Sequence, residues 1–411
     1  MRRKRKSEKE QRKQTDMEIA VIGGGASGIF ASIAARENGN TVTVFERGER
    51  IGKKILATGN GRCNLTNINA DIENYHGNET EFMRDIINSF WVEETLEKFS
   101  DMGLVCRTEE RGKVYPYCGQ ASAVLDVLRM KLLEDGVVIR TGFEASNIDR
   151  TKNGFIISSY DGQKAYADKV IIACGGKASP SLGSNGSGYE LLKRLGHHIT
   201  ELCPSLVQIK TEPDVVKKLK GIKIEGTLSV SNRSETGEIL FTEYGISGPC
   251  AFYLSAYCGN ERYAYMDLMP DYTTGEIEEM LYTRIGSFPE RKLEEFFTGM
   301  LNKRVGQALL KYLDIAPLSK TAEMLGNDEV EKNAKTIKSW RFEITGTMSW
   351  NNAQVTKGGA VTSEFNSKTL ESKIVKGVYA CGEVLDIDGD CGGYNLQWAW
   401  ASGYTAGKSC V

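Results

Sequence analysis

Hydrophobic positions in the first third of the chain follow two patterns that alternate along the sequence. Short runs rich in β-branched residues, EIAVIG at 18–23 and TVTVFE at 41–46, predict strands. Apolar residues recur at helical spacing over about 27–38, 80–102 and 119–135, which predicts a helix in each range. Strands that alternate with helices are typical of an α/β fold with a parallel sheet.

The pattern changes twice farther along the chain. Residues 137–174 alternate apolar and polar positions with turns at Asn-Gly and Asp-Gly, which predicts a β-meander. Residues 191–345 begin with strand-like segments and continue into PERKLEEFFTGMLNKRVGQALLKYL, whose spacing is helical. We therefore predict an inserted domain over 191–345. The predicted parts are a domain of 17–190 and 346–411, and an insert that is β-rich over 200–285 and helical over 286–340.

Glycine is more frequent here than usual, at 44 of 411 residues against a typical share of about 7%. The glycines gather in three stretches, 17–64, 170–188 and 377–407. In the last two, an apolar run precedes small residues, as happens where a strand delivers its backbone to a ligand. We expect one ligand to bring the three stretches together.

The first stretch carries a dinucleotide-binding fingerprint in its structural context. Gly23, Gly25 and Gly28 follow the predicted strand at GxGxxG spacing and open the predicted helix. In that order, they allow a tight turn, the approach of a pyrophosphate, and close packing of helix on strand. The helix N-terminus then offers free N–H groups to the phosphates. Glu46 ends the second strand, where a carboxylate binds the ribose hydroxyls, so we expect FAD or NAD without a 2′-phosphate.

Three further segments favour FAD over NAD. Glu383 follows a short strand in YACGEV and suits a hydrogen bond to a ribityl hydroxyl, a group that NAD lacks. GGYNLQWAWASGYTAG predicts a helix whose first N–H groups, near Asn395, Leu396 and Gln397, face an electron-rich ring edge. Residues 52–67, GKKILATGNGRCNLTN, are dense in hydrogen-bond donors for pyrophosphate and flavin; we call them the donor loop.

The charge balance excludes a strong overall attraction to nucleic acids or membranes, since 52 Lys and Arg face 54 Asp and Glu. Residues 1–16 are the exception, with eight basic and three acidic side chains and almost nothing apolar, and we predict a disordered tail there. A weak RNA or anionic-lipid anchor is the alternative for this tail. No window holds the roughly 18 apolar residues of a membrane span. We expect a small-molecule substrate and neither nucleic acid nor membrane as partner, and leave the oligomeric state open.

Ten cysteines are scattered through the chain without a CxxC pair, and only three histidines accompany them. This usage fits buried thiols in a reducing cytoplasm, so we expect a cytoplasmic protein without a bound metal. Cys63, in the donor loop, is either a redox thiol or a small packed side chain. Because no second cysteine lies close to it in sequence, packing is favoured.

Seven ordered blocks between about 17 and 411 resemble the BaiN/YhiN-like flavoprotein family, whose known activities include aminoacetone oxidase and 3-dehydro-bile acid Δ4,6-reductase. The blocks are GGGASG, GKKILATGNGRCNLTN, GKVYPYCGQAS, ACGGKASPSLGSNGSGY, FTEYGISGP, QVTKGGAV and GEVLDIDGDCGGYNLQWAWASG. The resemblance implies an α/β protein with non-covalent FAD on a glutathione-reductase-like Rossmann domain built from both chain ends. The inserted domain would then be part β-barrel and part helical. Cys391 stands where other members often have Thr, so we place no chemistry on it.

The fingerprint, the donor loop and the resemblance together predict the cofactor site. The expected FAD-binding residues are Gly23, Gly25, Ala26, Ser27, Gly28, Glu46, Arg47, Lys54, Asn60, Gly61, Arg62, Ala145, Ala173, Gly175, Gly176, Gly382, Glu383, Gly393, Asn395, Leu396 and Gln397. The resemblance alone implies Ala145, as a backbone contact to adenine.

Tyr115 and Tyr117 in KVYPYCGQ are candidates for a catalytic proton donor, and packing beside Pro116 is the alternative. The leading hypothesis is an FAD-dependent oxidoreductase that takes electrons from transiently bound NAD(P)H and reduces an activated C=C of an unsaturated ketone, such as a bile acid or steroid. A second hypothesis is an aminoacetone-type amine oxidase that uses oxygen. A third, from another class, is a flavin-containing RNA-binding or redox-sensing protein, which the basic tail motivates.

Overall fold

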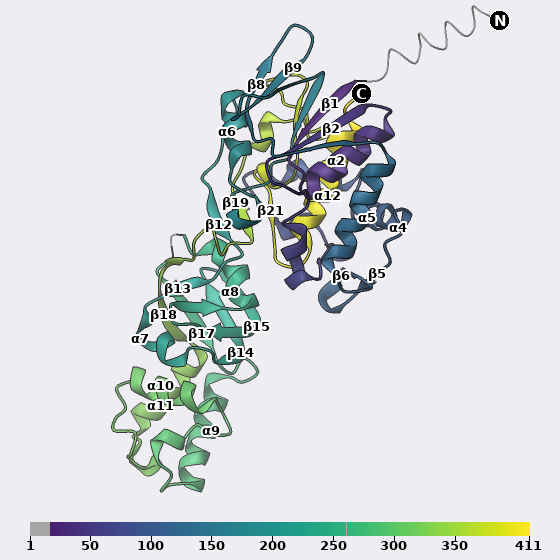
Figure 1. The fold of residues 1–411 in the computed structure, drawn as a ribbon. Coiled ribbons are helices and arrows are strands. Elements are labelled where there is room, and N and C mark those ends of the chain that lie inside the picture. Colours follow the sequence, from purple (N-terminus) through teal and green to yellow (C-terminus); the bar gives the residue numbers. More distant parts are fainter. Residues whose placement is uncertain (1–16, 260) are drawn as a thin grey trace, which may run out of the picture. The chain divides into compact units, whose positions relative to one another are not determined.

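The computed structural model describes residues 17–259 and 261–411 and divides the chain into two compact units (Figure 1). The first unit takes the chain up to Cys203 and resumes at Gln354, and the second spans Pro204–Ala353. The tail predicted for residues 1–16 lies outside the described residues. The second unit therefore begins and ends later in the chain than the inserted domain that the sequence predicts, which starts at 191 and ends at 345.

A five-stranded parallel sheet forms the centre of the first unit, in the order β20-β11-β1-β2-β7. Its strands are β1 (Glu18–Ile22), β2 (Thr41–Glu46), β7 (Val138–Thr141), β11 (Lys169–Ile172) and β20 (Val378–Ala380). The apolar runs of β1, β11 and β20 are almost fully buried, as expected of parallel strands covered on both faces. The sheet therefore joins strands from both ends of the chain.

Two helices from opposite ends of the chain pack on each other in the first unit: α2 (Ala26–Glu37) and α12 (Tyr394–Lys408). A Cβ at Gly403 would lie 2.3 Å from the Ser27 carbonyl oxygen, and one at Gly407 would lie 2.1 Å from that of Ala31. Only glycine permits this backbone-to-backbone approach. Because both contacts advance by four residues on each helix, the two helices run parallel.

Smaller elements surround the sheet and these two helices. The predicted meander is the antiparallel sheet β10-β9-β8, while β7 and β11, which flank it in sequence, belong to the parallel sheet. Two further small sheets have the orders β3-β6-β5 and β21-β4. The bounds are β3 (Thr66–Asn67), β4 (Tyr75–His76), β5 (Cys106–Thr108), β6 (Lys113–Pro116), β8 (Ala145–Arg150), β9 (Phe155–Ser159), β10 (Lys164–Ala167), β19 (Val355–Lys357), β21 (Asp388–Gly389), α3 (Arg84–Ile87), α4 (Val92–Asp101), α5 (Ala121–Glu134) and α6 (Ser187–Arg194).

The single helix predicted over 80–102 is wrong, because the chain there forms α3 and α4 with a break between them. At the break, Glu94 accepts a hydrogen bond from the Trp91 N–H at 2.8 Å, and the Trp91 indole donates to the Ala70 carbonyl at 3.0 Å. These bonds start a new helix instead of continuing the old one. The predictions at 27–38 and 119–135 agree with α2 and α5 to within about two residues.

The second unit contains a closed six-stranded barrel in the order β13-β16-β15-β14-β17-β18. Alternate residues of β14 are buried, as expected when one face of each strand points into a barrel. Its elements are β13 (Ile209–Thr211), β14 (Lys223–Val230), β15 (Arg233–Phe241), β16 (Gly245–Ser247), β17 (Tyr263–Asp267), β18 (Trp340–Thr347), α7 (Pro213–Val216), α8 (Pro249–Leu254), α9 (Thr274–Ser287), α10 (Lys303–Tyr312) and α11 (Asn327–Lys338). The predicted combination of α/β sheet, barrel and helices is confirmed, and the likeness to glutathione reductase stays a prediction.

The helical part of the second unit begins earlier than the predicted residue 286. Helix α9 starts at Thr274, where Thr273 and Glu276 form a capping box through bonds of 2.7–3.3 Å. The TTGE sequence carries the Thr-x-x-Glu signature of this box and was the available signal. Among the described residues, no helix combines the length and apolar character needed to cross a membrane.

The contact between α2 and α12 gives a first test. Gly407→Ala should lower the free energy of unfolding by about 1–3 kcal/mol, because the new Cβ overlaps the Ala31 carbonyl. Gly286→Ala is the matched control, since it lies in helix α9 with nothing within 4 Å of its ideal Cβ, and it should not destabilise the protein. Urea unfolding measures both, and equal stabilities of the two variants would contradict the close contact.

Candidate cofactor site

The turn between β1 and α2 has the geometry expected of a phosphate-binding turn. Gly23 has a φ of 110°, and a Cβ there would lie 2.3 Å from the Ala173 carbonyl oxygen. A Cβ at Gly28 would lie 1.9 Å from the Gly23 carbonyl oxygen, so both glycines are required by close packing. A Cβ at Gly25, in contrast, meets nothing within 4 Å. Packing of the fold therefore does not explain why Gly25 is glycine, whereas the predicted approach of a pyrophosphate would.

The N-terminus of α2 leaves backbone donors beside this open space. Ile29 is the first residue whose N–H bonds inside the helix, to the Gly25 carbonyl at 2.9 Å. The N–H groups of Ala26, Ser27 and Gly28 therefore have no partner within the helix. No acidic residue occupies the first turn. This end of the helix suits an anion.

Glu46 is held rigidly next to the turn. Its two carboxylate oxygens accept hydrogen bonds from the Gly24 N–H at 2.9 Å and the Gly48 N–H at 2.7 Å. Each oxygen keeps a lone pair for a further donor, such as a ribose hydroxyl. Arg47 points elsewhere: it donates to the Gly183 carbonyl at 2.9 Å and pairs with Glu144 at 3.5 Å, which places Ala145 at this end of the site. The structure thus brings the predicted nucleotide-end residues together.

Glu383 connects three of the predicted segments. One of its carboxylate oxygens accepts from Lys54 Nζ at 3.0 Å, and the other accepts from the Thr356 N–H at 2.8 Å. Gly176 lies against the same carboxylate, since a Cβ there would come within 2.7 Å of it. The donor loop, the turn after β11 and the turn after β20 therefore meet at one carboxylate. Sequence reasoning missed Thr356, whose hydroxyl accepts from the Lys177 and Ala178 N–H groups.

The N-terminus of α12 forms the other end of the candidate site. Gly393 has a φ of 104°, and a Cβ there would lie 2.4 Å from the Thr66 carbonyl oxygen in the donor loop. Gln397 is the first residue that bonds inside the helix, to Gly393 at 3.0 Å, so the N–H groups of Tyr394, Asn395 and Leu396 have no partner within it. These groups fit the predicted contact to an electron-rich ring edge.

The side chains of Asn395 and Gln397, which were predicted to bind the cofactor, form hydrogen bonds within the protein. The Asn395 carboxamide bonds the Gly389 N–H at 2.8 Å and the Gly389 carbonyl at 2.6 Å, so only its backbone N–H is left for a cofactor. Gln397 is fully buried and bonds Thr66 at 2.7 Å and Thr95 at 3.0 Å. Because its N–H and its side chain are both used inside the protein, we do not carry Gln397 forward as a cofactor contact.

Asn64 is a candidate contact that sequence reasoning missed. Its residue is 8% exposed, and its side-chain oxygen is buried without a hydrogen-bond partner among the described residues. Gly59 and Gly393 enclose it, since a Cβ at Gly59 would lie 2.8 Å from the Asn64 nitrogen and one at Gly393 would lie 3.0 Å from its Oδ1. A carboxamide presents a donor and an acceptor side by side, which complements the carbonyl and N–H edge of a flavin pyrimidine ring. No sequence signal pointed to Asn64, because Gly393 is distant from it in the chain.

The two candidate tyrosines lie in different surroundings. Tyr115 is 9% exposed, with the Arg62 guanidinium 4.1 Å from its ring centre, and burial raises the pKa of its phenol, which therefore stays protonated. Tyr117 is 65% exposed and has Arg107 5.8 Å from its ring centre. Glu109 pairs with both Arg62 and Arg107 and so joins the donor loop to the β5–β6 hairpin.

The surroundings of Cys63 disfavour a redox role for its thiol. It is fully buried, and burial raises the pKa of its thiol to about 12. A thiol that remains protonated is a poor nucleophile, which supports packing as its role. No group of three or more His, Cys, Asp or Glu within the described ranges is placed to hold a metal ion.

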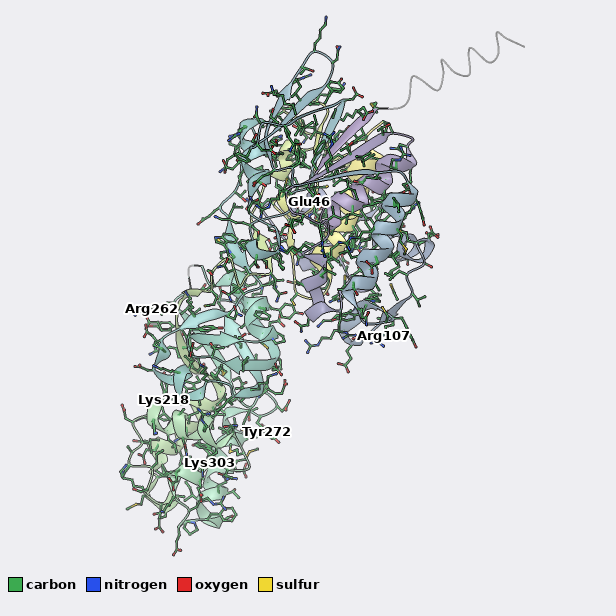
Figure 2. All side chains as sticks on the ribbon, in the orientation of Figure 1. Glu46, Arg107, Lys218, Arg262, Tyr272 and Lys303 are labelled. Atoms are coloured by element: carbon green, nitrogen blue, oxygen red, sulfur yellow. The ribbon has the colours of Figure 1, made fainter. Side chains whose placement is uncertain are left out.

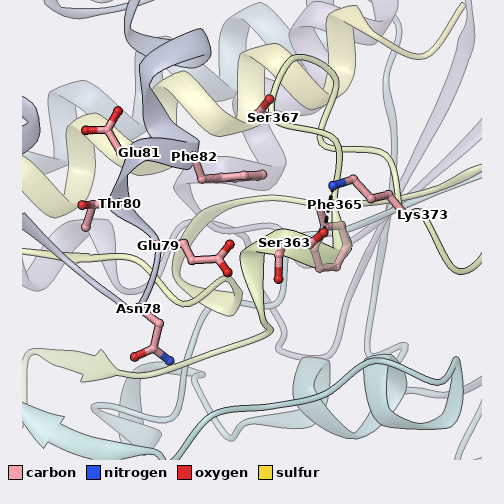
Figure 3. A pocket seen from close by; sticks show the side chains of 9 residues that line it. All are labelled: Asn78, Glu79, Thr80, Glu81, Phe82, Ser363, Phe365, Ser367 and Lys373. Carbon is pink, nitrogen blue, oxygen red and sulfur yellow. Dashed lines mark hydrogen bonds between the residues drawn. The ribbon is translucent and has the colours of Figure 1, made fainter.

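A pocket elsewhere on the first unit is separate from the cofactor site (Figure 3). Two loops line it, and Lys373 Nζ donates to the Ser363 carbonyl at 2.8 Å within it. Its lining residues are Asn78, Glu79, Thr80, Glu81, Phe82, Ser363, Phe365, Ser367 and Lys373. None of the residues predicted to bind the cofactor is among them.

Comparison with known proteins gives matches over nearly the whole chain. Residues 17–409 match the family described as HI0933-like protein Rossmann domain. The 3-dehydro-bile acid delta(4,6)-reductase of Clostridium scindens is 41% identical, over 96% of this chain and 98% of that protein. The ribosomal RNA dihydrouridine synthases of Escherichia coli and Haemophilus influenzae are 28% and 29% identical, each over 95% of this chain and over 97% and 98% of their own lengths. These matches confirm the resemblance predicted from the seven blocks.

The open space at Gly25 gives a second test. Gly25→Val should leave the free energy of unfolding within about 1 kcal/mol, because the apo fold has room for the side chain. FAD binding should weaken by at least about tenfold, since a displaced pyrophosphate loses charge-assisted hydrogen bonds worth about 1.5–3 kcal/mol each. Gly275→Val in helix α9 also meets open space and should keep its flavin. Titration of the apo protein with FAD measures the affinity of both variants. Wild-type affinity in the Gly25 variant would refute the placement of a pyrophosphate at this turn.

Proposed function

The chain belongs to the HI0933-like family of Rossmann-domain proteins, and from this premise we propose that it is an FAD-dependent oxidoreductase that reduces a C=C bond conjugated to a carbonyl group. The observation that carries the cofactor assignment is the pair of helix N-termini, α2 beside an open glycine turn and α12 beside Asn64. Glu46 lies beside the glycine turn and Glu383 is bonded to Lys54 of the donor loop, and in this proposal their carboxylate oxygens accept from the hydroxyls of a ribose and a ribityl chain. When bound, FAD supplies a two-electron carrier that accepts a hydride and passes it to an electron-poor carbon.

The reaction class rests on what the named relatives have in common. A 3-dehydro-bile acid with double bonds at positions 4 and 6 holds C=C bonds conjugated to a ketone. Uridine, which a dihydrouridine synthase reduces, holds a C=C bond conjugated to a ring carbonyl. In each case we propose that a hydride adds to the carbon made electron-poor by the carbonyl, the β-carbon of an enone or the δ-carbon of a dienone, that a proton adds to its neighbour in the former double bond, and that this C=C bond becomes single. We propose NAD(P)H as the source of the hydride.

Tyr115 suits the role of proton donor in this reaction better than Tyr117 does. The Tyr115 phenol is protonated, its ring is fixed by Arg62, and a Cβ at Gly59 of the donor loop would lie 3.2 Å from it. A general acid must be held within hydrogen-bond reach of the carbon that it protonates. Tyr117 is exposed at the hairpin surface, where it is free to contact a larger substrate.

Anaerobic stopped-flow spectroscopy tests the proposed reaction. NADH or NADPH should bleach the flavin band at about 450 nm, and a 4,6-dien-3-one steroid or uridine-containing RNA should restore it. Tyr115→Phe should bleach at the wild-type rate, because hydride transfer to the flavin does not use the phenol, while reoxidation by the substrate slows by about 10²–10⁴-fold. Bleaching of the flavin band by aminoacetone alone, with recovery in oxygen, would contradict the reductase assignment and support an oxidase.

Uridine in RNA is a second candidate substrate, favoured by the surface beside the donor loop. The β5–β6 hairpin exposes Tyr117 and Val105 together with Arg107, a combination of aromatic and cationic side chains typical of sites that stack unpaired bases and hold phosphates. Arg62 pairs with Glu109 of the same hairpin, and Arg111 lies in its turn. Two of the named relatives act on ribosomal RNA by their printed names.

A pair of arginine variants distinguishes the two substrates. Arg107 and Arg262 are both exposed, both pair with a glutamate and both lie near a tyrosine ring, in the first and second unit respectively (Figure 2). If RNA is the substrate, Arg107→Gln should raise the KM for RNA about three- to tenfold and reduce its salt dependence, while Arg262→Gln stays close to wild type. Dihydrouridine content by mass spectrometry measures turnover. Equal KM values for both variants would show that the hairpin does not take part in RNA recognition.

A further inference from the structure

Asp388 is a buried acid with an unsatisfied oxygen in the first unit. It lies on β21, whose antiparallel pairing with β4 puts it opposite His76. The residue is 2% exposed, and its Oδ1 has no hydrogen-bond partner among the described residues. A carboxylate that keeps its charge in such a place loses hydration without full compensation. A neutral carboxylic acid avoids most of that cost.

Charged groups approach Asp388 from several elements, with opposing effects. Burial is the largest influence and raises its pKa to about 7. His76 from β4 and Lys357 from β19 favour the ionised form, whereas Asp386 and Glu383, which precede it in the chain, disfavour it. The phenol of Tyr189, on α6, also lies within reach of its charge. The nearby cations therefore do not offset burial and the two carboxylates.

The backbone that carries Asp388 leads directly to the N-terminus of α12. Gly389, the next residue, has both its N–H and its carbonyl bonded to the Asn395 carboxamide in the first turn of that helix. Asn67 of the donor loop donates to the Gly392 carbonyl at 3.1 Å, one residue before the helix cap. A shift of β21 is therefore transmitted to the helix end that we place against the flavin.

We propose that Asp388 is a positioning residue of the cofactor site, which holds the Gly389–Gly393 turn and the α12 N-terminus in place as a neutral acid and loosens them when it ionises. The inference rests on the proposed function only where it concerns FAD. The buried acid itself is a property of the apo protein. We therefore expect the affinity for FAD to fall as the pH rises through neutrality.

The apo protein gives the first half of the test. An acid with a raised folded pKa stabilises the fold below its unfolded pKa, near 4, and this contribution is lost as the pH rises toward about 7. Over that range Asp388 alone lowers the folding equilibrium constant by about tenfold per pH unit. Urea unfolding of wild type and Asp388→Asn, from pH 5 to 8.5, measures the free energy of unfolding at each pH. This free energy should depend less steeply on pH in the variant. Parallel curves would overturn the proposal.

Asp328→Asn is the control for this measurement. Asp328 is an exposed acid in the first turn of α11 in the second unit, whereas β21 and its neighbours belong to the first unit. Its variant should keep the wild-type pH dependence. If Asp388→Asn does not fold, infrared spectra of the wild-type apo protein supply a second measurement, since a buried protonated carboxyl should lose its C=O band between pH 6 and 8.5. A band that does not change over this range would overturn the proposal.

FAD binding gives the second half. The wild-type dissociation constant for FAD should rise by at least about tenfold from pH 6 to 8.5, whereas Asp388→Asn should bind FAD equally at both pH values. A wild type that shows the apo pH dependence but binds FAD equally well at both pH values would overturn the link to α12. A protein with the apo pH dependence and no FAD binding at any pH would refute the proposed function and leave the buried acid standing.

Discussion

The close contact of α2 with α12 is the constraint on which the candidate site depends. Gly403 and Gly407 let the two helix backbones touch at Ser27 and Ala31, and the helices run parallel. Because α12 begins well before the level of Ser27, its N-terminus extends about 12 Å beyond that of α2, at 1.5 Å per residue. Two sets of unpaired N–H groups, from opposite ends of the chain, therefore point the same way with a fixed offset. An elongated ligand with an anionic centre and an electron-rich end matches such an arrangement, whereas a single phosphate would use only one of the two helices.

Electrostatics then ties the middle of the site together. The Glu383 carboxylate accepts bonds from Lys54 and Thr356 and lies against Gly176, so segments that are far apart in sequence share one partly buried junction. Hydrogen bonds to a charged group in partly buried surroundings are stronger than those in water. Removing the charge of Lys54 or of Glu383 would leave the other charge without its partner. The site is therefore held as a unit and does not depend on any single loop.

Much of this arrangement could be predicted from the sequence, because it depends on local patterns. The spacing of Gly23, Gly25 and Gly28 and the strand that ends at Glu46 identify the nucleotide turn through the conformations that glycine permits. The alternation of strands and helices indicates the α/β sheet. What could not be predicted depends on partners distant in the chain. The sequence does not show that Gln397 turns toward Thr66 and Thr95, or that Asn64 lies between two glycines. The break at Trp91 was missed because apolar spacing continues through it, and only its capping bonds reveal it.

The same reasoning explains why a neutral acid is tolerated next to the α12 helix. The first turn of α12 carries no acidic side chain, and its N–H groups present the positive end of the helix dipole. A cofactor that gains electrons during turnover accumulates negative charge, which a helix end placed as we propose would stabilise. An ionised carboxylate on the adjoining strand would oppose that stabilisation, since charges in buried surroundings are weakly screened. Asp388, nearly fully buried and close to Asp386 and Glu383, is placed where its own ionisation is disfavoured. The turn thus keeps a polar side chain for positioning while adding little negative charge below about pH 7.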